Sequence, residues 1–242
     1  MANKAQKKLI EELVQHYRDN IPEFKTFASV LRTQVLGSSA LRKHIRFVRV
    51  RVKDPDHLRD KLYRKLKEAS DRGRPFNYSK ENLFVRINDL AGLRIIHLHT
   101  QQIIPIRDSL GALFEEEKYR VVEGPTARIW DEEYKRFFKE AGIATKTGRT
   151  LYTSVHYVLK PNRKTAITCE LQVRTLLEEV WGEVDHELNY PHESGILACR
   201  EQLAVLARAT WSCNRLIDAI YRTKEEADQR RLREVHGRAD QP

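Results

Sequence analysis

The stretch that decides the fold covers residues 151–175 and reads LYTSVHYVLKPNRKTAITCELQVRT. Two strand-like segments, 151–160 and 165–174, flank the turn residues Pro161-Asn162-Arg163-Lys164, an order typical of a β-hairpin. Because side chains alternate along a strand, each segment carries a polar face: Tyr152, Ser154 and His156 on the first, Glu170, Gln172 and Arg174 on the second. Charged groups are costly to bury without partners, so the pattern predicts that this hairpin lines a solvated cleft.

A second alternating segment lies upstream, at residues 47–53 (FVRVRVK). It predicts a strand that buries its valines and presents three cations on the opposite face: Arg49, Arg51 and Lys53. Residues 54–56 (DPD) then start a helix with an apolar stripe at Leu58, Leu62 and Leu66 and with Lys61 on another face. Cations on neighbouring elements suit phosphate binding. An ordinary edge strand is the alternative interpretation of the alternating arginines.

The pattern of strand-like and helical segments predicts one compact domain with helical extensions at both ends of the chain. Pro22 divides the first extension, residues 4–36, into two predicted helices. Segment 124–150 is predicted to be largely irregular, with a breaker at Gly124-Pro125 and a basic loop at 145–150. The other predicted elements are strands at 93–98 and 119–122, helices at 101–117, 131–141 and 176–190, and a long helix or helix pair from 194 to 231.

We divide the chain into three parts on this basis: N-terminal helices at 1–40, a central domain at 41–191, and a C-terminal helical extension with a basic tail at 192–242. In the helix at 176–190, the spacing of the apolar residues predicts four inward positions: Leu177, Trp181, Val184 and Leu188. Three of its polar residues fall on another side: Glu179, Glu183 and His186.

The composition limits the choice of function. Over 242 residues, 44 Lys and Arg against 34 Asp and Glu give a net charge of +10, which attracts phosphates, nucleotides or nucleic acid. Apolar runs stay well below the roughly 20 residues that a membrane helix needs, and the charged first residues do not resemble a signal peptide, so we expect a cytoplasmic protein without a membrane partner. We expect the three cysteines, Cys169, Cys199 and Cys213, to be reduced and buried.

Two acidic residues are placed where a metal site can form. Asp89 precedes one predicted strand and Glu170 lies within another, so together they can offer two carboxylate ligands to Mg²⁺. Tyr152 provides a flat face for stacking a base, and His156 provides a titratable group beside it. A structural Glu170–Arg174 ion pair and a core position for Tyr152 are the alternatives; the joint occurrence of acidic and basic groups on successive elements favours a site. Motifs of P-loop, Rossmann and H-E-x-x-H enzymes are absent from the sequence.

Five blocks, in this order, resemble the RelA/SpoT alarmone synthetase domain: 51–53 (RVK) with Lys61, 89–94 (DLAGLR), 152–156 (YTSVH), 170–175 (ELQVRT) and 181–190 (WGEVDHELNY). The resemblance spans roughly residues 40–191. It implies an α+β fold, a mixed β-sheet flanked by helices and related to nucleotidyltransferases. It also implies a small, stand-alone synthetase. The implied reaction transfers the β,γ-pyrophosphate of ATP to the 3′ hydroxyl of GDP or GTP and releases AMP. Glycine stands at position 182, where this family usually has alanine, and residues 123–150 depart from its acceptor-side loop.

The resemblance also implies roles for individual residues. Arg51, Lys53 and Lys61 would bind the ATP phosphates, with Arg49 on the same strand face. Asp89 would bind Mg²⁺, and Glu170 would bind Mg²⁺ or take the proton of the attacking hydroxyl. The acceptor side would be formed by Tyr152 against the base and by His156, Gln172, Arg174 and His186. A toxin-like enzyme that modifies the 3′ end of tRNA and a non-enzymatic RNA-binding module are the alternatives. The sequence leaves open a homo-oligomer or a neutralising partner.

Overall fold

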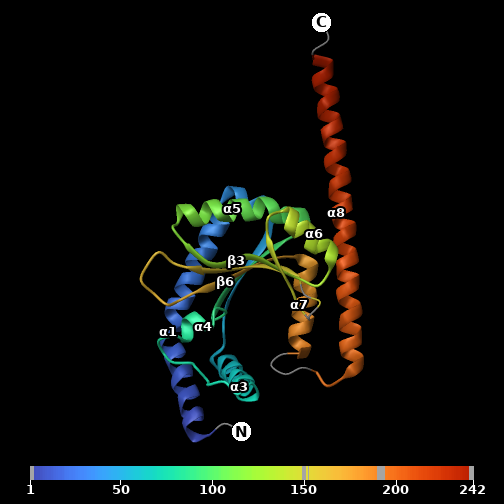
Figure 1. Cartoon of the computed structure of the whole chain (residues 1–242). Helices are drawn as coiled ribbons and strands as arrows, with labels where there is room; N and C mark the ends of the chain where they lie inside the picture. Colours follow the sequence, from blue (N-terminus) through green and yellow to red (C-terminus); the bar gives the residue numbers. More distant parts are fainter. Residues whose placement is uncertain (1–2, 149–150, 152, 190–193, 240–242) are drawn as a thin grey trace.

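A mixed β-sheet organises the protein (Figure 1). The computed structural model describes residues 3–148, 151, 153–189 and 194–239. Within these residues the sheet has six strands in the order β1-β2-β6-β5-β3-β4. Their bounds are β1 (Ile45–Val52), β2 (Ala91–His97), β3 (Arg120–Ile129), β4 (Ala144–Thr147), β5 (Ser154–Lys160) and β6 (Cys169–Thr175). β5 and β6 form the predicted antiparallel hairpin at the centre, and β6 pairs with β2 in parallel. The predicted α+β class is confirmed.

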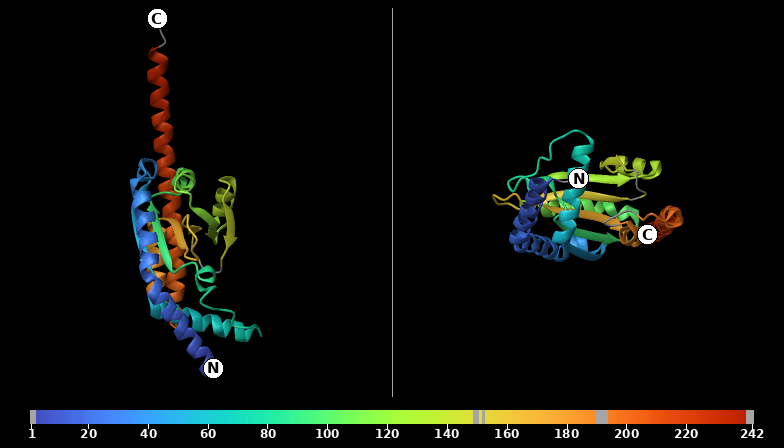
Figure 2. Two further views of the ribbon diagram at one scale, coloured as in Figure 1. Left: turned by 90° about the vertical axis from the view of Figure 1, so that its left-hand side faces the viewer. Right: turned by 90° about the horizontal axis from the view of Figure 1, so that it is seen from below.

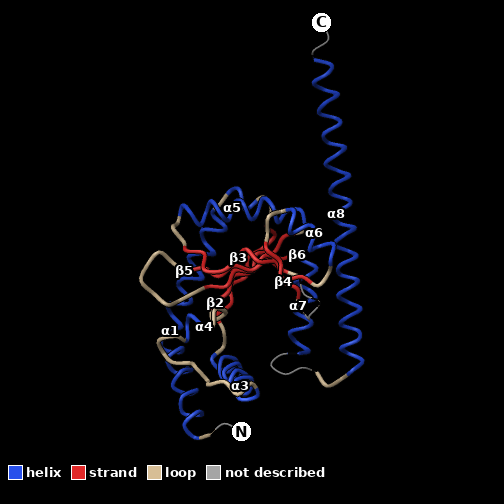
Figure 3. The backbone as a smooth tube through the Cα atoms, in the orientation of Figure 1, coloured by secondary structure: helices blue, strands red, loops and turns tan. Residues whose placement is uncertain are grey.

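Helices cover both faces of the sheet. In Figure 3, α5 lies above the red strands and α3 and α7 lie below them. The helical elements are α1 (Lys4–Gly37), α2 (Ser39–Arg42), α3 (Pro55–Asp71), α4 (Leu83–Arg86), the 3₁₀ turn η1 (Thr100–Gln102), α5 (Ile103–Glu116), α6 (Glu132–Glu140), α7 (Leu176–Asn189) and α8 (Leu197–Ala239). α8 packs along α7 and then extends beyond the rest of the molecule (Figures 1 and 2). In the described part of the chain, no helix combines the length and apolar character needed to cross a bilayer.

The N-terminal segment is one helix, and the prediction of two helices separated by Pro22 is wrong. α1 runs from Lys4 to Gly37 with Pro22 inside it. Buried residues lie on both sides of the proline, from Ile10 to Tyr17 and from Phe24 to Val35, and they belong to the same core cluster as the sheet. Packing of this continuous face compensates for the cost of about 3 kcal/mol that proline imposes on a helix interior.

The segment predicted to be irregular contains two strands. β3 passes through Gly124-Pro125, with register shifts against β5 between Val121 and Thr126. Gly124 has φ +93°, and a Cβ there would collide with the His156 carbonyl oxygen, so only glycine lets the strand pass at this point. β4 forms where a basic loop was predicted, because it pairs in parallel with the end of β3. The predicted helix at 131–141 is confirmed as α6.

Two smaller predictions need correction. Val184 and Leu188 of α7 are exposed rather than inward, because the helix turns Glu178, Glu179 and Trp181 towards the protein. The C-terminal extension is a single helix, which is one of the two predicted alternatives. Of the three free cysteines only Cys169 is buried; Cys199 is partly exposed and Cys213 is exposed.

Candidate active site

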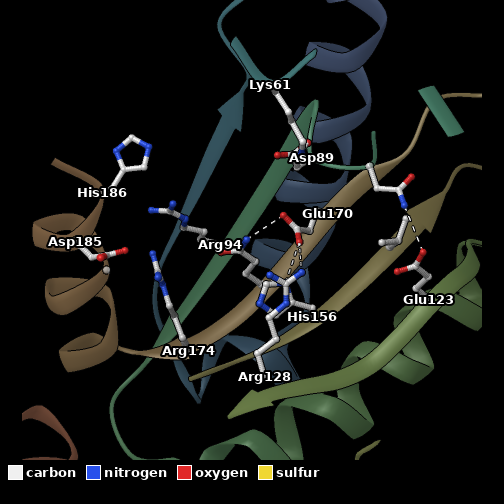
Figure 4. Close-up of a pocket in the computed structure, with 14 residues that line it drawn as sticks. Lys61, Asp89, Arg94, Glu123, Arg128, His156, Glu170, Arg174, Asp185 and His186 are labelled. Carbon is white, nitrogen blue, oxygen red and sulfur yellow. Dashed lines mark hydrogen bonds and ion pairs between the residues drawn. The ribbon is translucent and has the colours of Figure 1, made fainter. Parts of the chain in front are cut away.

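A polar pocket of about 450 Å³ opens on the face of the sheet that α7 flanks (Figure 4). Its walls come from α3, the segment before β2, four strands and α7. The lining residues are Lys61, Asn88, Asp89, Arg94, Glu123, Arg128, His156, Val158, Glu170, Gln172, Arg174, Gly182, Asp185 and His186. The hairpin therefore lines a cleft, as its polar faces predict.

Asp89 is held at one side of the pocket by two lysines. Lys53 follows β1, and its backbone N–H donates to the Leu90 carbonyl at 2.9 Å, which places its side chain beside Asp89. Lys53 Nζ lies 3.2 Å from Asp89 Oδ2, and Lys61 Nζ, from α3, lies 2.7 Å from Oδ1. Burial alone would raise the pKa of Asp89, but the two ammonium groups outweigh it and hold the pKa below its usual value. Asp89 is therefore ionised at neutral pH.

Glu170 occupies the centre of the pocket floor. Its Oε1 lies 2.9 Å from His156 Nδ1, and its Oε2 accepts a hydrogen bond from Gln172 Nε2 at 3.0 Å. Arg128 Nη2, from β3, lies 3.8 Å from Oε1. Burial and the charge of Asp89 raise the pKa of Glu170, but His156 and Arg128 outweigh them and the pKa lies below its usual value. This second carboxylate is also ionised.

The donor set around these carboxylates fits Mg²⁺. Both residues line the same pocket, and they lie close enough for the charge of Asp89 to act on the pKa of Glu170. Mg²⁺ is commonly held by one or two carboxylates, with water and substrate phosphates completing its shell. The described residues contain no group of three or more His, Cys, Asp or Glu side chains able to hold a metal by themselves. Asp89 and Glu170 therefore suit an ion that arrives together with a phosphate ligand.

A buried ion pair forms the wall between β6 and α7. Arg174 is 2% exposed and contacts Glu179, which is itself buried. Glu179 Oε1 also accepts from Arg94 Nη1 at 3.2 Å, so one carboxylate joins two strands to the helix. Gly182, one turn further along α7, lies against the Arg174 guanidinium. The wall thus keeps two guanidinium groups in fixed positions along the pocket.

A second groove, of about 430 Å³, adjoins the pocket at Arg94 and His186, which line both. Arg49 and Arg51 line it from β1, and Arg51 Nη2 lies 3.5 Å from His186 Nε2. Burial, followed by the charge of Arg51, lowers the pKa of His186. Arg49 pairs with Glu183 on α7 at 3.1 Å. The groove is the more cationic end of the site.

The structure brings most of the predicted site residues together, while their roles stay predictions. Seven line the main pocket: Lys61, Asp89, His156, Glu170, Gln172, Arg174 and His186. Lys53 reaches it through Asp89, and Arg51 adjoins it through His186. Arg49 does not reach the main pocket; it lies in the second groove and pairs with α7. Tyr152, the predicted stacking residue, lies outside the described residues.

Sequence reasoning did not select several lining residues. Arg128 was missed because its segment was predicted to be irregular, although it pairs across the sheet with Ser154. Arg94 was missed although it stands among apolar residues on β2, and a cation in a buried strand is itself a signal of a nearby acidic partner. Glu179 and Glu183 supply that partner from α7.

Comparison with protein families identifies this arrangement. A match to the family described as "Region found in RelA / SpoT proteins" covers residues 50–195. The chain belongs to the RelA/SpoT family. The match begins within β1 and includes the residues that line the main pocket, whereas α1 and α8 lie outside it.

Solved structures with the RelA/SpoT fold include small alarmone synthetases. Small alarmone synthetase 1 from Bacillus subtilis, bound to its product pppGpp, has a TM-score of 0.59 and 22% identity over 87% of this chain and 98% of its own. The same enzyme bound to AMPCPP has a TM-score of 0.56 and 20% identity over 86% and 98% of the two chains. A GTP pyrophosphokinase family protein from Streptococcus pneumoniae has a TM-score of 0.55 and 21% identity over 90% and 95%. At these identities the comparison shows a common fold. No curated protein sequence matches the chain.

Proposed function

We propose that this RelA/SpoT protein is a pyrophosphokinase that transfers the β,γ-pyrophosphate of ATP to the 3′ hydroxyl of GDP or GTP, giving (p)ppGpp and AMP. The observation that carries the proposal is that two ionised carboxylates, Asp89 and Glu170, line one pocket together with several cationic side chains. The family and the common fold with enzymes solved with pppGpp and AMPCPP support it.

The donor phosphates fit the side of the site formed by β1, α3 and the cationic groove. Arg51, Lys53 and Lys61 supply positive charge there, with Arg49 and Arg94 further along the groove. Such charge offsets the negative charge that develops on the phosphate oxygens during transfer. Lys53 is almost fully buried, and burial lowers its pKa although Asp89 opposes this effect. Lys53 and Lys61 share the negative charge of Asp89, and a donor phosphate would supply further negative charge to both lysines.

The acceptor fits the opposite side, along the hairpin. Tyr152 would stack on the base, and His156, Gln172 and Arg174 would hold the acceptor's polar groups. His186 would reach the acceptor from α7, where it borders the donor groove. Glu170 would accept the proton of the 3′ hydroxyl, for which an ionised carboxylate is required. Asp89 and Glu170 would hold Mg²⁺, which supplies charge neutralisation at the phosphates when bound. Placing the two nucleotides in line is the main task of such a site, because phosphoryl-type transfer depends chiefly on position and electrostatics.

Incubation with γ-labelled ATP and one acceptor at a time tests the proposal. The acceptors are GDP, GTP, AMP, ADP and deacylated tRNA, each with Mg²⁺. We expect label on GDP or GTP together with stoichiometric AMP. Label on tRNA alone would replace the proposed acceptor by the tRNA 3′ end, and label on none would favour an RNA-binding module.

A substitution at the pocket floor tests the role of the central carboxylate. Glu170→Gln keeps the shape and the hydrogen bond to His156 but removes the charge, so we expect transfer to fall by at least about 10³-fold. Circular dichroism and thermal unfolding should show that the fold is retained. Glu140→Gln, at an exposed position at the end of α6 and outside the pocket lining, is the matched control and should stay within about threefold of the parent. Glu170→Gln activity within that same range would contradict the assignment.

A further inference from the structure

Three polar side chains on the pocket floor form a continuous hydrogen-bonded row. Ser154 Oγ lies 2.5 Å from His156 Nε2, and His156 Nδ1 lies 2.9 Å from Glu170 Oε1. Ser154 and His156 are two residues apart on β5 and share a face, while Glu170 reaches them from neighbouring β6. Ser154 is 1% exposed, whereas His156 and Glu170 line the pocket, so the row leads from the protein interior to the candidate base.

The position of each hydrogen in this row follows from the chemistry of its ends. An ionised carboxylate only accepts hydrogen bonds, so the hydrogen between His156 and Glu170 belongs to Nδ1. A neutral imidazole carries a single ring hydrogen, which leaves Nε2 to accept from the Ser154 hydroxyl. The other neutral tautomer would set the Nδ1 lone pair against the carboxylate at 2.9 Å, a repulsive contact.

We propose that Ser154 is a positioning residue for Glu170 and acts through the Nδ1-protonated tautomer of His156. The inference rests on the proposed function, in which Glu170 takes the proton of the 3′ hydroxyl. In that step the O–H bond breaks and its proton moves to a carboxylate oxygen of Glu170. The 3′ oxygen bonds to the β-phosphorus of ATP, and the bond to the leaving AMP breaks. Because Nδ1 already carries a hydrogen, His156 orients the carboxylate and does not take the proton from it.

NMR on the full-length protein labelled with ¹⁵N-histidine tests the tautomer without substrate. Long-range ¹H–¹⁵N correlations distinguish protonated from unprotonated ring nitrogens, and His156→Gln assigns the signals by their loss. We expect a protonated Nδ1 and an unprotonated Nε2 in the parent near pH 7. In Ser154→Ala the Nε2 resonance should shift from its parental position, because the hydroxyl that donates to this nitrogen is removed. A protonated Nε2 in the parent, or no change in Ser154→Ala, would overturn the inference.

Kinetics then test whether the row positions the base. Ser154→Ala should lower kcat about tenfold, the equivalent of one hydrogen bond, and leave the KM for ATP unchanged. Ser154→Thr retains the hydroxyl and should recover most of the rate. Thr153→Ala is the matched control, since it removes a buried hydroxyl from the preceding residue, which lines a separate small pocket beside α8, and it should keep the parental kcat.

An unchanged kcat in Ser154→Ala would also overturn the inference while leaving the proposed reaction intact. Conversely, a parent protein that transfers pyrophosphate to no acceptor would refute the proposed reaction, and the NMR measurement would still decide the tautomer. Each of the two conclusions can therefore be refuted without refuting the other.

Discussion

At the scale of single residues, Gly182 fixes the position of a pocket cation. A Cβ at this position would lie 2.5 Å from Arg174 Nη1 and 3.3 Å from its Cζ. The guanidinium cannot simply swing away, because Arg174 is buried and contacts Glu179. Because Gly182 has no side chain, the Arg174 guanidinium can lie close against α7.

We expect Gly182→Ala to raise the KM for the acceptor at least fivefold and to change the KM for ATP less. Two opposing effects act on the free energy of unfolding of this variant. Alanine stabilises the helix by up to about 1 kcal/mol, whereas displacing the guanidinium disturbs a buried ion pair and destabilises the fold. Separate titrations of each nucleotide, with thermal unfolding, measure both. Gly111→Ala is the matched control, because a Cβ added to this α5 glycine would have no neighbouring atom within 4 Å, so only the gain in helix stability is expected. An unchanged acceptor KM in Gly182→Ala would show that Arg174 tolerates the methyl group.

The sequence predicted seven of the fourteen residues that line the main pocket, largely because alternation along strands determines which side chains share a face. His156, Glu170 and Gln172 were predicted together for this reason, and the register pairs His156 with Gln172. Arg94 and Glu179 were not combined into an ion pair, because their contact depends on how α7 crosses the sheet, which no local pattern encodes.

At the scale of elements, α1 supports the Lys53–Asp89 side of the pocket from outside the family match. The hydroxyl of Tyr17, fully buried, donates to the Lys53 carbonyl at 2.6 Å and lies 3.2 Å from the Leu90 carbonyl. These two carbonyls belong to the residues that follow β1 and precede β2, and Leu90 is adjacent to Asp89. The helix thus joins the two backbone segments that present Lys53 and Asp89.

We expect Tyr17→Phe to lower the free energy of unfolding by about 1–3 kcal/mol, because it leaves a buried carbonyl oxygen without this donor while the ring still packs. Urea denaturation measures the change. Tyr78→Phe removes a hydroxyl from a partly exposed tyrosine whose ring packs at a tilt against Phe76, and its free energy of unfolding should stay within about 0.5 kcal/mol of the parent's. Equal midpoints for both variants would contradict a structural role for the Tyr17 hydroxyl.

The elements that were predicted wrongly share a physical cause. Pro22 and Gly124-Pro125 weaken helix and strand locally, and the sequence signal is correct about that local preference. Contacts between distant segments override it: the continuous buried face of α1 in one case, and the pairing of β3 with β5 in the other. Elements with strong periodicity and no such conflict, such as α3 and the β5–β6 hairpin, were predicted correctly.

At the scale of the whole molecule, two buried groups give opposite contributions to the pH dependence of stability. Burial raises the pKa of Glu178, in the first turn of α7, to about 7, and burial lowers the pKa of His97 to about 4. Below about pH 7 the folded state retains the Glu178 proton that the unfolded state releases, so acidification towards the usual value of 4.5 stabilises the fold. Below about pH 6.5 the unfolded state protonates His97 and the folded state does not, so acidification destabilises the fold.

We expect Glu178→Gln to remove only the first contribution. The difference in unfolding free energy between variant and parent should therefore change by about 1.4 kcal/mol per pH unit between pH 4.5 and 7, with the variant losing stability relative to the parent on acidification. Denaturation curves at several pH values measure this difference, to which groups common to both proteins do not contribute. Glu187→Gln, at an exposed position of the same helix, should give curves parallel to the parent's. Parallel curves for Glu178→Gln would show that this carboxyl is ionised in the folded protein.

The strand order has a consequence for how the protein is made. β2 ends at His97 and pairs with β6, which begins only at Cys169. The pairing at the centre of the sheet can therefore form only after a segment that is synthesised much later. During translation the inner edge of β2 stays open until β6 leaves the ribosome, and an unpaired edge is a template for pairing with other chains. Asp89 and Glu170 come together only at this closure. A nascent chain therefore gains the pocket between Asp89 and Glu170 in one late step, and truncated chains that end before β6 present an unpaired strand edge without this pocket.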